Sequence, residues 1–201
     1  MKKEKNRGIV FNNIFFHNND EGGEKMNRTV TLEKLYVHPI TQKYLTRSGM
    51  EHAITVAEKA YEIALQRNIN PDLATKAGFL HDIGHYKWYQ PNGQWDYESY
   101  RKKDIHPIKG AARAHKLLIR CGEDPVRAKE IALAILFHTD SFLPDGKLNL
   151  SPLQQVVAMA DTIVEEPGGK HHYRKISFEA GLERIRLLDR KIENMLNINV
   201  G

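Results

Sequence analysis

The clearest chemistry in this sequence is carried by an adjacent histidine and aspartate, His81 and Asp82, within Leu-His-Asp-Ile-Gly. A neighbouring imidazole and carboxylate near a helix end can offer one metal ion two ligands of different hardness. The other ligands must then come from elsewhere in the chain. Histidine and aspartate side chains on the apolar faces of other helices supply them, and the candidate metal ligands are His52, His81, Asp82, His106, His138 and Asp161.

The elements that must position these residues are helices that follow one another from Thr31 onwards. Apolar residues recur at helical spacing, and prolines, glycines and polar caps mark the ends. We expect helices over residues 31–36, 39–47, 50–67, 71 to about 84, 107–120, 125–138, 152–166 and 177–197, with a long loop over 86–104. No repeat and no convincing strand interrupts them. The sequence therefore predicts an all-α, single-domain helical bundle.

The candidate ligands share helix faces with apolar residues. His52 lies one turn before Val56, and Asp161 lies four residues after Val157. A buried carboxylate costs on the order of several kcal/mol unless a cation compensates it. Because few inward Lys or Arg residues are expected, the cation is predicted to be a metal. Six ligands suit two ions bridged by Asp82, whereas four would suit one.

A single histidine on an apolar helix face is weak evidence for a metal site. Such residues are more often hydrogen-bonded core residues than ligands. The prediction therefore rests on the coincidence of six candidate residues in one chain.

The composition is that of an ordinary globular protein. Its 201 residues are 41% hydrophobic and 27% charged, which suits one domain with a sizeable core. No apolar run approaches the roughly 18 residues of a membrane span, and the N-terminus lacks a signal-peptide pattern. The one cysteine, Cys121, excludes an internal disulfide and a thiolate cluster. We therefore expect a cytoplasmic protein with no membrane partner.

The charge balance favours a small anionic partner. A net charge of +5 at pH 7 fits a nucleotide phosphate. Lys and Arg are dispersed, without the basic run or stripe that typically binds nucleic acids. A small-molecule nucleotide is therefore favoured over DNA or RNA, and the sequence leaves a homodimer open.

Residues 1–27 differ from the rest of the chain because they show neither helical period nor strand alternation. We interpret them as a disordered extension or as a mis-assigned N-terminus. Back-translation of residues 21–26 allows a bacterial ribosome-binding sequence directly before the Met26 codon, which would make Met26 the physiological start. The folded domain is expected over residues 28–201.

The order of the candidate ligands resembles the HD superfamily of metal-dependent phosphohydrolases. His52 comes first, His81 and Asp82 follow in Leu-His-Asp-Ile-Gly, and Asp161 stands in Met-Ala-Asp-Thr-Ile. The extra histidines in His-Pro-Ile-Lys-Gly-Ala and Phe-His-Thr, His106 and His138, are similar to its dinuclear branch. Within that branch, the segments around these residues are most similar to the HD-domain symmetrical bis(5′-nucleosyl)-tetraphosphatases.

That resemblance implies an HD-type helical bundle that binds iron and cleaves diadenosine tetraphosphate into two ADP molecules. Imidazole and carboxylate donors without thiolates suit two Fe ions, with Mn and Zn as alternatives. Two ions would activate a water and neutralise charge on the phosphoryl oxygens. Three alternatives stay open: a di-iron oxygenase with the same ligands, a phosphodiesterase or nucleotidase for another nucleotide, and a nucleotide-sensing module with a structural metal.

The chain also departs from these relatives. The cyclic-di-GMP phosphodiesterases of the superfamily carry two consecutive histidines where this chain has Phe137 and His138, which argues against cyclic di-GMP. Relative to the tetraphosphatases, His85 replaces a frequent lysine, the 86–104 loop is long, and residues 167–173 look inserted. These differences fall where a substrate would be recognised.

Two residues near the ligands join Asp82 as candidates for catalysis. Lys109, one turn after His106, could hold a phosphate, with a solvated helix lysine as the alternative. His85, one turn after His81, is interpreted as a proton donor to the leaving group; a seventh ligand and an ordinary helix-end histidine are its alternatives.

Candidates for substrate binding lie further out. With Lys109, the basic loop is expected to hold distal phosphates through Lys170, His171, His172 and Arg174. Trp88, Tyr89, Trp95 and Tyr97 could stack on a base, although packing against helices is the commoner role of such aromatics. His115 is expected in the core.

Overall fold

The computed structural model describes residues 28–86, 94, 96–140 and 148–198, and all regular structure in those ranges is helical. The all-α prediction is therefore confirmed. The predictions for residues 1–27 and for Trp88, Tyr89 and Trp95 lie outside the described residues. The elements are α1 (Leu32–Tyr36), α2 (Pro39–Ser48), α3 (Met50–Gln66), α4 (Pro71–Leu80), α5 (Tyr97–Lys103), α6 (His106–Cys121), α7 (Pro125–Leu136), α8 (Pro152–Val164), the 3-10 helix η1 (Pro167–Tyr173) and α9 (Phe178–Ile198).

Local capping chemistry sets the helix ends. Ser151 and Gln154 form a capping box at the start of α8, and the Asn70 side chain accepts two backbone N–H groups at the start of α4. At the end of α2 the chain turns through Gly49, whose φ of 115° is one that glycine adopts without strain. This turn lets α3 start at once, at Met50, two residues before His52.

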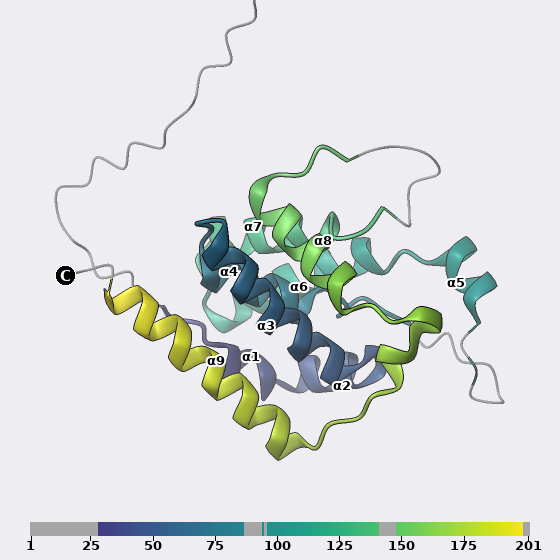
Figure 1. Cartoon of the computed structure of the whole chain (residues 1–201), viewed down its shortest axis with the longest axis horizontal. Helices are drawn as coiled ribbons and strands as arrows, with labels where there is room; N and C mark the ends of the chain where they lie inside the picture. Colours follow the sequence, from purple (N-terminus) through teal and green to yellow (C-terminus); the bar gives the residue numbers. More distant parts are fainter. Residues whose placement is uncertain (1–27, 87–93, 95, 141–147, 199–201) are drawn as a thin grey trace, which may run out of the picture.

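Helix α3 lies at the centre of the bundle, and α4, α8 and α9 pack against it (Figure 1). Its apolar stripe, including Ala53, Val56 and Ala57, is fully buried. Small residues on this stripe let neighbouring helices approach closely. Long α9 runs along one side of the bundle, with Ile185 and Ile192 inward, while α5 projects on the opposite side.

Two segments that we predicted as loops contain helical structure. Helix α5 falls within residues 86–104; its sequence, Tyr-Glu-Ser-Tyr-Arg-Lys-Lys, has no apolar period, and the Asp96 side chain caps it by accepting the backbone N–H of Ser99. The basic loop forms η1. His115 is also a correction, since it is exposed on α6, whose buried side runs through Ala114 and Leu118.

A buried ionic network joins α4 and α7 to α9 and to the start of the described chain. The ammonium of Lys76, fully buried, lies 2.7 Å from Asp72 and 2.6 Å from Glu123. Arg28 lies 2.6 Å from the same Asp72. Arg127 also pairs with Asp72, and Arg28 with Asp189. The expectation of few inward cations was therefore wrong, but these cations pair with carboxylates outside the candidate ligand set.

None of the helices in the described part of the chain combines the length and hydropathy of a membrane-spanning segment.

Candidate metal centre

The turn after α4 and the first residues of α6 are in contact through two glycines, Gly84 and Gly110. A Cβ on Gly84 would overlap the carbonyl oxygen of His106 and the backbone nitrogen of Gly110. Only glycine permits this approach of one backbone to another. The glycine of Leu-His-Asp-Ile-Gly therefore brings His81 and Asp82 beside His106.

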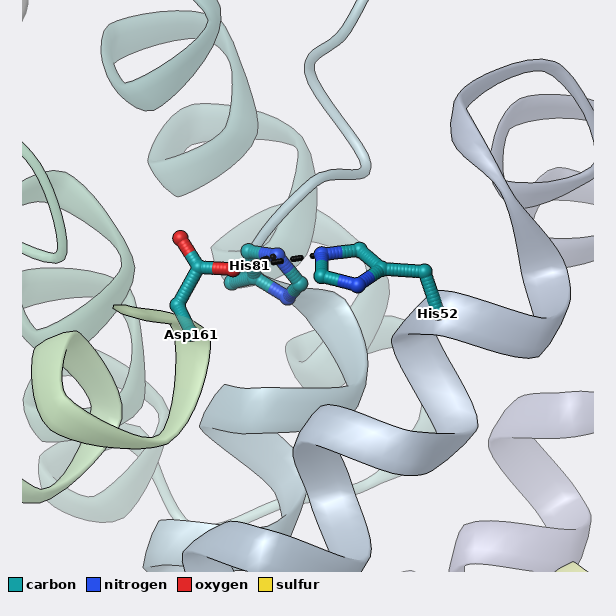
Figure 2. A group of neighbouring side chains, drawn as sticks. All are labelled: His52, His81 and Asp161. Atoms are coloured by element: carbon teal, nitrogen blue, oxygen red, sulfur yellow. Dashed lines mark ion pairs between the residues drawn. The ribbon is translucent and has the colours of Figure 1, made fainter. Parts of the chain in front are cut away.

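All six predicted ligands lie together at this junction. His52 comes from α3, His81 and Asp82 from just beyond α4, His106 from the first residue of α6, His138 from just beyond α7 and Asp161 from α8. Figure 2 shows His52, His81 and Asp161 pointing towards one another from three different segments. The structure thus brings the six residues together, and their role as ligands stays a prediction.

Asp82 lies between two groups of histidines. Its Oδ2 lies 3.4 Å from Nε2 of His81 and 3.9 Å from Nε2 of His52. Its Oδ1 lies 3.5 Å from Nε2 of His106, 3.5 Å from Nε2 of His85 and 3.9 Å from Nε2 of His138. One carboxylate therefore presents a separate oxygen to each group.

Asp161 belongs mainly to the first of these groups. Its Oδ1 lies 3.2 Å from Nε2 of His52 and 3.3 Å from Nε2 of His81, while Oδ2 lies 4.0 Å from Nε2 of His138. His52, His81 and Asp161 are close enough together to hold an ion, with Oδ2 of Asp82 beside them.

Outer hydrogen bonds orient the imidazoles. Nδ1 of His81 donates to the Gly78 carbonyl at 2.7 Å, and Nδ1 of His138 donates to the Ile135 carbonyl at 2.7 Å. Because Nδ1 carries the proton in each ring, the Nε2 lone pair is left for the centre when the imidazole is neutral. This arrangement is typical of metal-ligating histidines.

His106 is oriented in the same way by a carboxylate. Its Nδ1 donates to Asp104, which also accepts the backbone N–H of His106 at 3.2 Å. Nε2 of His106 then lies only 3.0 Å from Nε2 of His138. Two lone pairs at that distance repel each other unless a positive charge lies nearby, so the pair favours a bound cation.

The charges of the two carboxylates at the centre also favour a bound cation. Burial alone would raise the pKa of Asp82, but the neighbouring imidazoles, His81 first among them, outweigh it and hold that pKa well below its usual value. Burial likewise opposes ionisation of Asp161, where His81 and His52 again lower the pKa. Both carboxylates are therefore negative while buried, a state that metal coordination stabilises.

The described residues fit a metal site by their donors and their space. Nε2 of His81 is buried and makes no hydrogen bond within the described part of the chain, although it faces two carboxylate oxygens. A cavity of about 30 Å³ lies between the candidate ligands, enough for small ions or waters. Four overlapping groups of three His and Asp side chains at the centre, which also include His85, Asp104 and His172, are close enough together to hold an ion.

Comparison with known proteins shows the family of this chain. Residues 49–165 match the family model of the HD domain. The chain belongs to the HD domain family. It is also 59% identical over 166 residues to a Bacillus subtilis (strain 168) protein named Putative phosphohydrolase YueE, across 83% of this chain and 94% of that relative. No solved structure shows a significant match to this chain. Together, the family and the relative support a hydrolase.

His85 lies inside the centre of this HD domain. Its ring stacks on His106 with the centroids 4.1 Å apart. Burial lowers the pKa of His85 to about 3, because its effect is larger than the opposite effect of the Asp82 charge. A neutral imidazole suits the role of metal ligand better than that of proton donor. The role of His85 stays a prediction.

Several residues of the centre were not predicted from the sequence. Tyr100 of α5 stacks on His85, with centroids 5.7 Å apart and an interplanar angle of 10°. Thr139 and Glu165 line the cavity with it. Asp104 orients His106, and its place two residues before that histidine was a usable signal, since Asp is common just before a helix start. Tyr100 gave no comparable signal.

The predicted substrate residues of the HD domain fall into two sets. His171 and His172 line the cavity at the centre. Lys109, Lys170 and Arg174 do not: the Lys109 ammonium lies 4.1 Å from the ring centroid of Tyr86, Lys170 is exposed, and Arg174 pairs with Glu166. Their roles in substrate binding stay predictions.

Proposed function

We propose that this HD domain is a metal-dependent phosphohydrolase that acts on nucleotides, with a dinucleoside polyphosphate such as diadenosine tetraphosphate as its substrate. The position of Asp82 is the observation that carries the proposal. Its two oxygens face two separate histidine groups, an arrangement suited to a pair of ions bridged by one carboxylate.

The residues present divide between two ions. His52, His81 and Asp161, with Oδ2 of Asp82, would hold one ion. His106 and His138, with Oδ1 of Asp82 and His85 as a further donor, would hold the other. Nitrogen and carboxylate donors without thiolates suit Fe first, with Mn and Zn as alternatives. When bound, the pair supplies charge neutralisation at the phosphoryl oxygens and an activated water.

The chain itself supplies orientation and a hydrogen-bond donor. The backbone N–H of Glu166 donates to Nδ1 of His171 at 3.0 Å, so a neutral His171 carries its proton on Nε2. His171 thus differs from the Nδ1-protonated histidines of the centre. We assign it as a hydrogen-bond donor to a phosphate oxygen.

A substrate panel tests this proposal. Anaerobically purified protein is assayed for phosphate, ADP and other nucleotide products with dinucleoside polyphosphates, nucleoside mono-, di- and triphosphates, and cyclic nucleotides. We expect ADP from diadenosine tetraphosphate at a rate at least about tenfold above any mononucleotide, and loss of turnover in Asp161→Asn.

Two results would contradict the proposal at different levels. Faster hydrolysis of mononucleotides or cyclic nucleotides would replace the dinucleoside polyphosphate but keep the phosphohydrolase. Oxygen uptake with a small organic substrate, and no hydrolysis across the panel, would replace the phosphohydrolase by an oxygenase.

A further inference from the structure

The cavity between the candidate ligands is too small for a nucleotide. Its volume of about 30 Å³ compares with roughly 300–1,000 Å³ for typical small-molecule sites. A nucleotide held there by one phosphate must therefore extend into neighbouring space. Two larger cavities share residues with the centre, and they differ in charge.

The first cavity, which we call the basic groove, has a volume of about 890 Å³ and lies between α2 and the segment 172–178. Its cationic lining residues are Lys43, Arg47, Arg174 and Lys175, and none of the described lining residues is acidic. Among the described residues, Lys43, Arg47 and Lys175 form no ion pair with a carboxylate. Such a surface suits a ligand with several negative charges.

His172 connects the basic groove to the metal centre, because it lines both cavities. Nδ1 of His172 donates to the carbonyl oxygen of Ser48 at 2.6 Å, which fixes η1 against the end of α2. A Cβ on Gly49 would lie 3.3 Å from Cα of His172, so the two backbones are in close contact. A phosphate chain that continued from the centre past His172 would lie in the basic groove.

Aromatic side chains complete the basic groove. Tyr173 is 42% exposed and Phe178 is 45% exposed, and both line the groove. Phe178 is held by its contact with Tyr36, at 5.3 Å between ring centroids. An exposed ring beside cations can stack on a nucleobase whose phosphates the cations bind.

The second cavity has the opposite charge. Its volume is about 520 Å³, it shares His138 and Asp161 with the centre, and its lining also includes Asp140 and Glu165 but no Lys or Arg among the described residues. Carboxylates repel a phosphate chain and accept hydrogen bonds from hydroxyl groups. Among the described residues, the charge of the basic groove therefore suits a polyphosphate chain better than the charge of this cavity.

We propose that the basic groove is a second nucleotide subsite, which binds a nucleoside diphosphate group beyond the metal centre and so selects substrates whose phosphate chain continues past the reacting phosphorus. This assignment deepens the proposed function and rests on it. It predicts that free ADP, as the matching product, binds to the basic groove.

A charge-reversal experiment on the full-length, metal-loaded protein tests the subsite. Lys43 and Lys175 are exposed and form no ion pair with a carboxylate among the described residues, and the Lys43 ammonium lies 5.5 Å from the centroid of the Tyr44 ring. The double variant Lys43→Glu/Lys175→Glu is therefore expected to fold. The matched control is Lys129→Glu, an exposed lysine on α7 outside the groove. Calorimetry measures the affinity for ADP, adenosine and pyrophosphate, and steady-state assays give KM and kcat for diadenosine tetraphosphate.

We expect the double variant to lose about tenfold or more in ADP affinity and to raise KM for diadenosine tetraphosphate by a similar factor, with metal content unchanged. Lys129→Glu should match the wild type. Pyrophosphate should bind more weakly than ADP, and adenosine more weakly still, because each lacks one part of the ligand. Equal ADP affinity in the wild type and the double variant would overturn the subsite.

The two proposals fail in different ways. If ADP binding depends on Lys43 and Lys175 but no phosphate bond is hydrolysed, the subsite stands and the proposed function fails. If diadenosine tetraphosphate is hydrolysed but ADP affinity and KM are the same in the wild type and the double variant, the function stands and the subsite fails. Tighter binding of short oligonucleotides than of ADP would also overturn the subsite in favour of a nucleic-acid surface.

Discussion

One carboxylate oxygen of Asp104 accepts the backbone N–H of His106 at 3.2 Å, and the other accepts the Nδ1–H of the same residue's imidazole. Asp104 therefore fixes both the start of α6 and the ring that faces Asp82. Removing such an outer partner typically costs a metal site about 10- to 100-fold in affinity.

Asp104→Ala is accordingly predicted to weaken metal binding by about 10- to 100-fold, measured by competition with a chromogenic chelator. Asp104→Asn keeps an oxygen acceptor and should lose less. Wild-type metal affinity in Asp104→Ala, with normal thermal stability, would show that Asp104 only caps the helix.

Gly84→Ala is predicted to separate the ends of α4 and α6. The added methyl group would overlap backbone atoms of His106 and Gly110, which cannot move as a flexible side chain would. We expect a loss of about 1–3 kcal/mol or more in unfolding free energy together with reduced metal content.

Gly122→Ala is the control for that substitution. Gly122 has a φ of 89° and no atom within 4 Å of an added Cβ, so Gly122→Ala introduces backbone strain without a clash. It should lower thermal stability but keep the metal. Equal metal content in both variants would contradict the role of Gly84 in the site.

The buried ionic network should matter for stability rather than for metal binding. Asp72 is fully buried and accepts hydrogen bonds from Arg28, Lys76 and Arg127. Asp72→Ala removes the one carboxylate that all three cations share and leaves three cations to the remaining buried partners Glu123 and Asp189. Urea unfolding should therefore show a loss of about 3–5 kcal/mol.

The matched control breaks an exposed ion pair. Glu98 and Lys102 are 70% and 67% exposed, and Glu98→Ala should change stability by no more than about 0.5 kcal/mol. A similarly small effect of Asp72→Ala would show that the network contributes nothing beyond a surface pair.

Metal-free protein is predicted to lose stability as the pH falls from about 6.5 to about 4. Burial lowers the pKa of His85 to about 3 and those of His106 and His138 to about 4, below the usual 6.5. The unfolded chain therefore takes up protons in this window while these folded-state rings do not, so unfolding becomes easier.

His81 acts in the opposite direction. Burial alone would lower its pKa, but Asp82 and Asp161 raise it well above 6.5, so its contribution is present at low pH and is lost as the pH rises through the folded-state pKa. Burial also lowers the pKa of His171, to about 3, and the pKa of His172, so five histidines oppose His81. Urea unfolding in EDTA should therefore give a lower midpoint at pH 5 than at pH 7. An equal or higher midpoint at pH 5 would contradict this balance.

Features encoded locally could be predicted from the sequence. Apolar stripes and caps placed the helices, and inward positions such as those of His52 and Asp161 brought the candidate ligands to one point. His115 was misplaced because one residue turns a helix by about 100°, enough to move a side chain from core to surface. The pattern on α6 was too permissive to fix its inward face.

Features that depend on long-range contacts could not be predicted in this way. The helix containing Tyr100 is polar and short, and its contact with His85 follows from the path of the chain rather than from any local pattern. The pairing of Arg28 with Asp189 joins residues 161 positions apart. The basic groove likewise combines α2 with the segment 172–178, which only tertiary packing brings together.

The central claim, that Asp82 bridges two metal ions, is tested most directly by the number of metal ions per chain. Anaerobically purified wild-type protein and Asp82→Ala are analysed by inductively coupled plasma mass spectrometry against protein concentration. The account predicts close to two ions per wild-type chain and the loss of both metal and phosphohydrolase activity in Asp82→Ala. A variant that keeps two ions per chain, or a fully active wild type with only one, would contradict it.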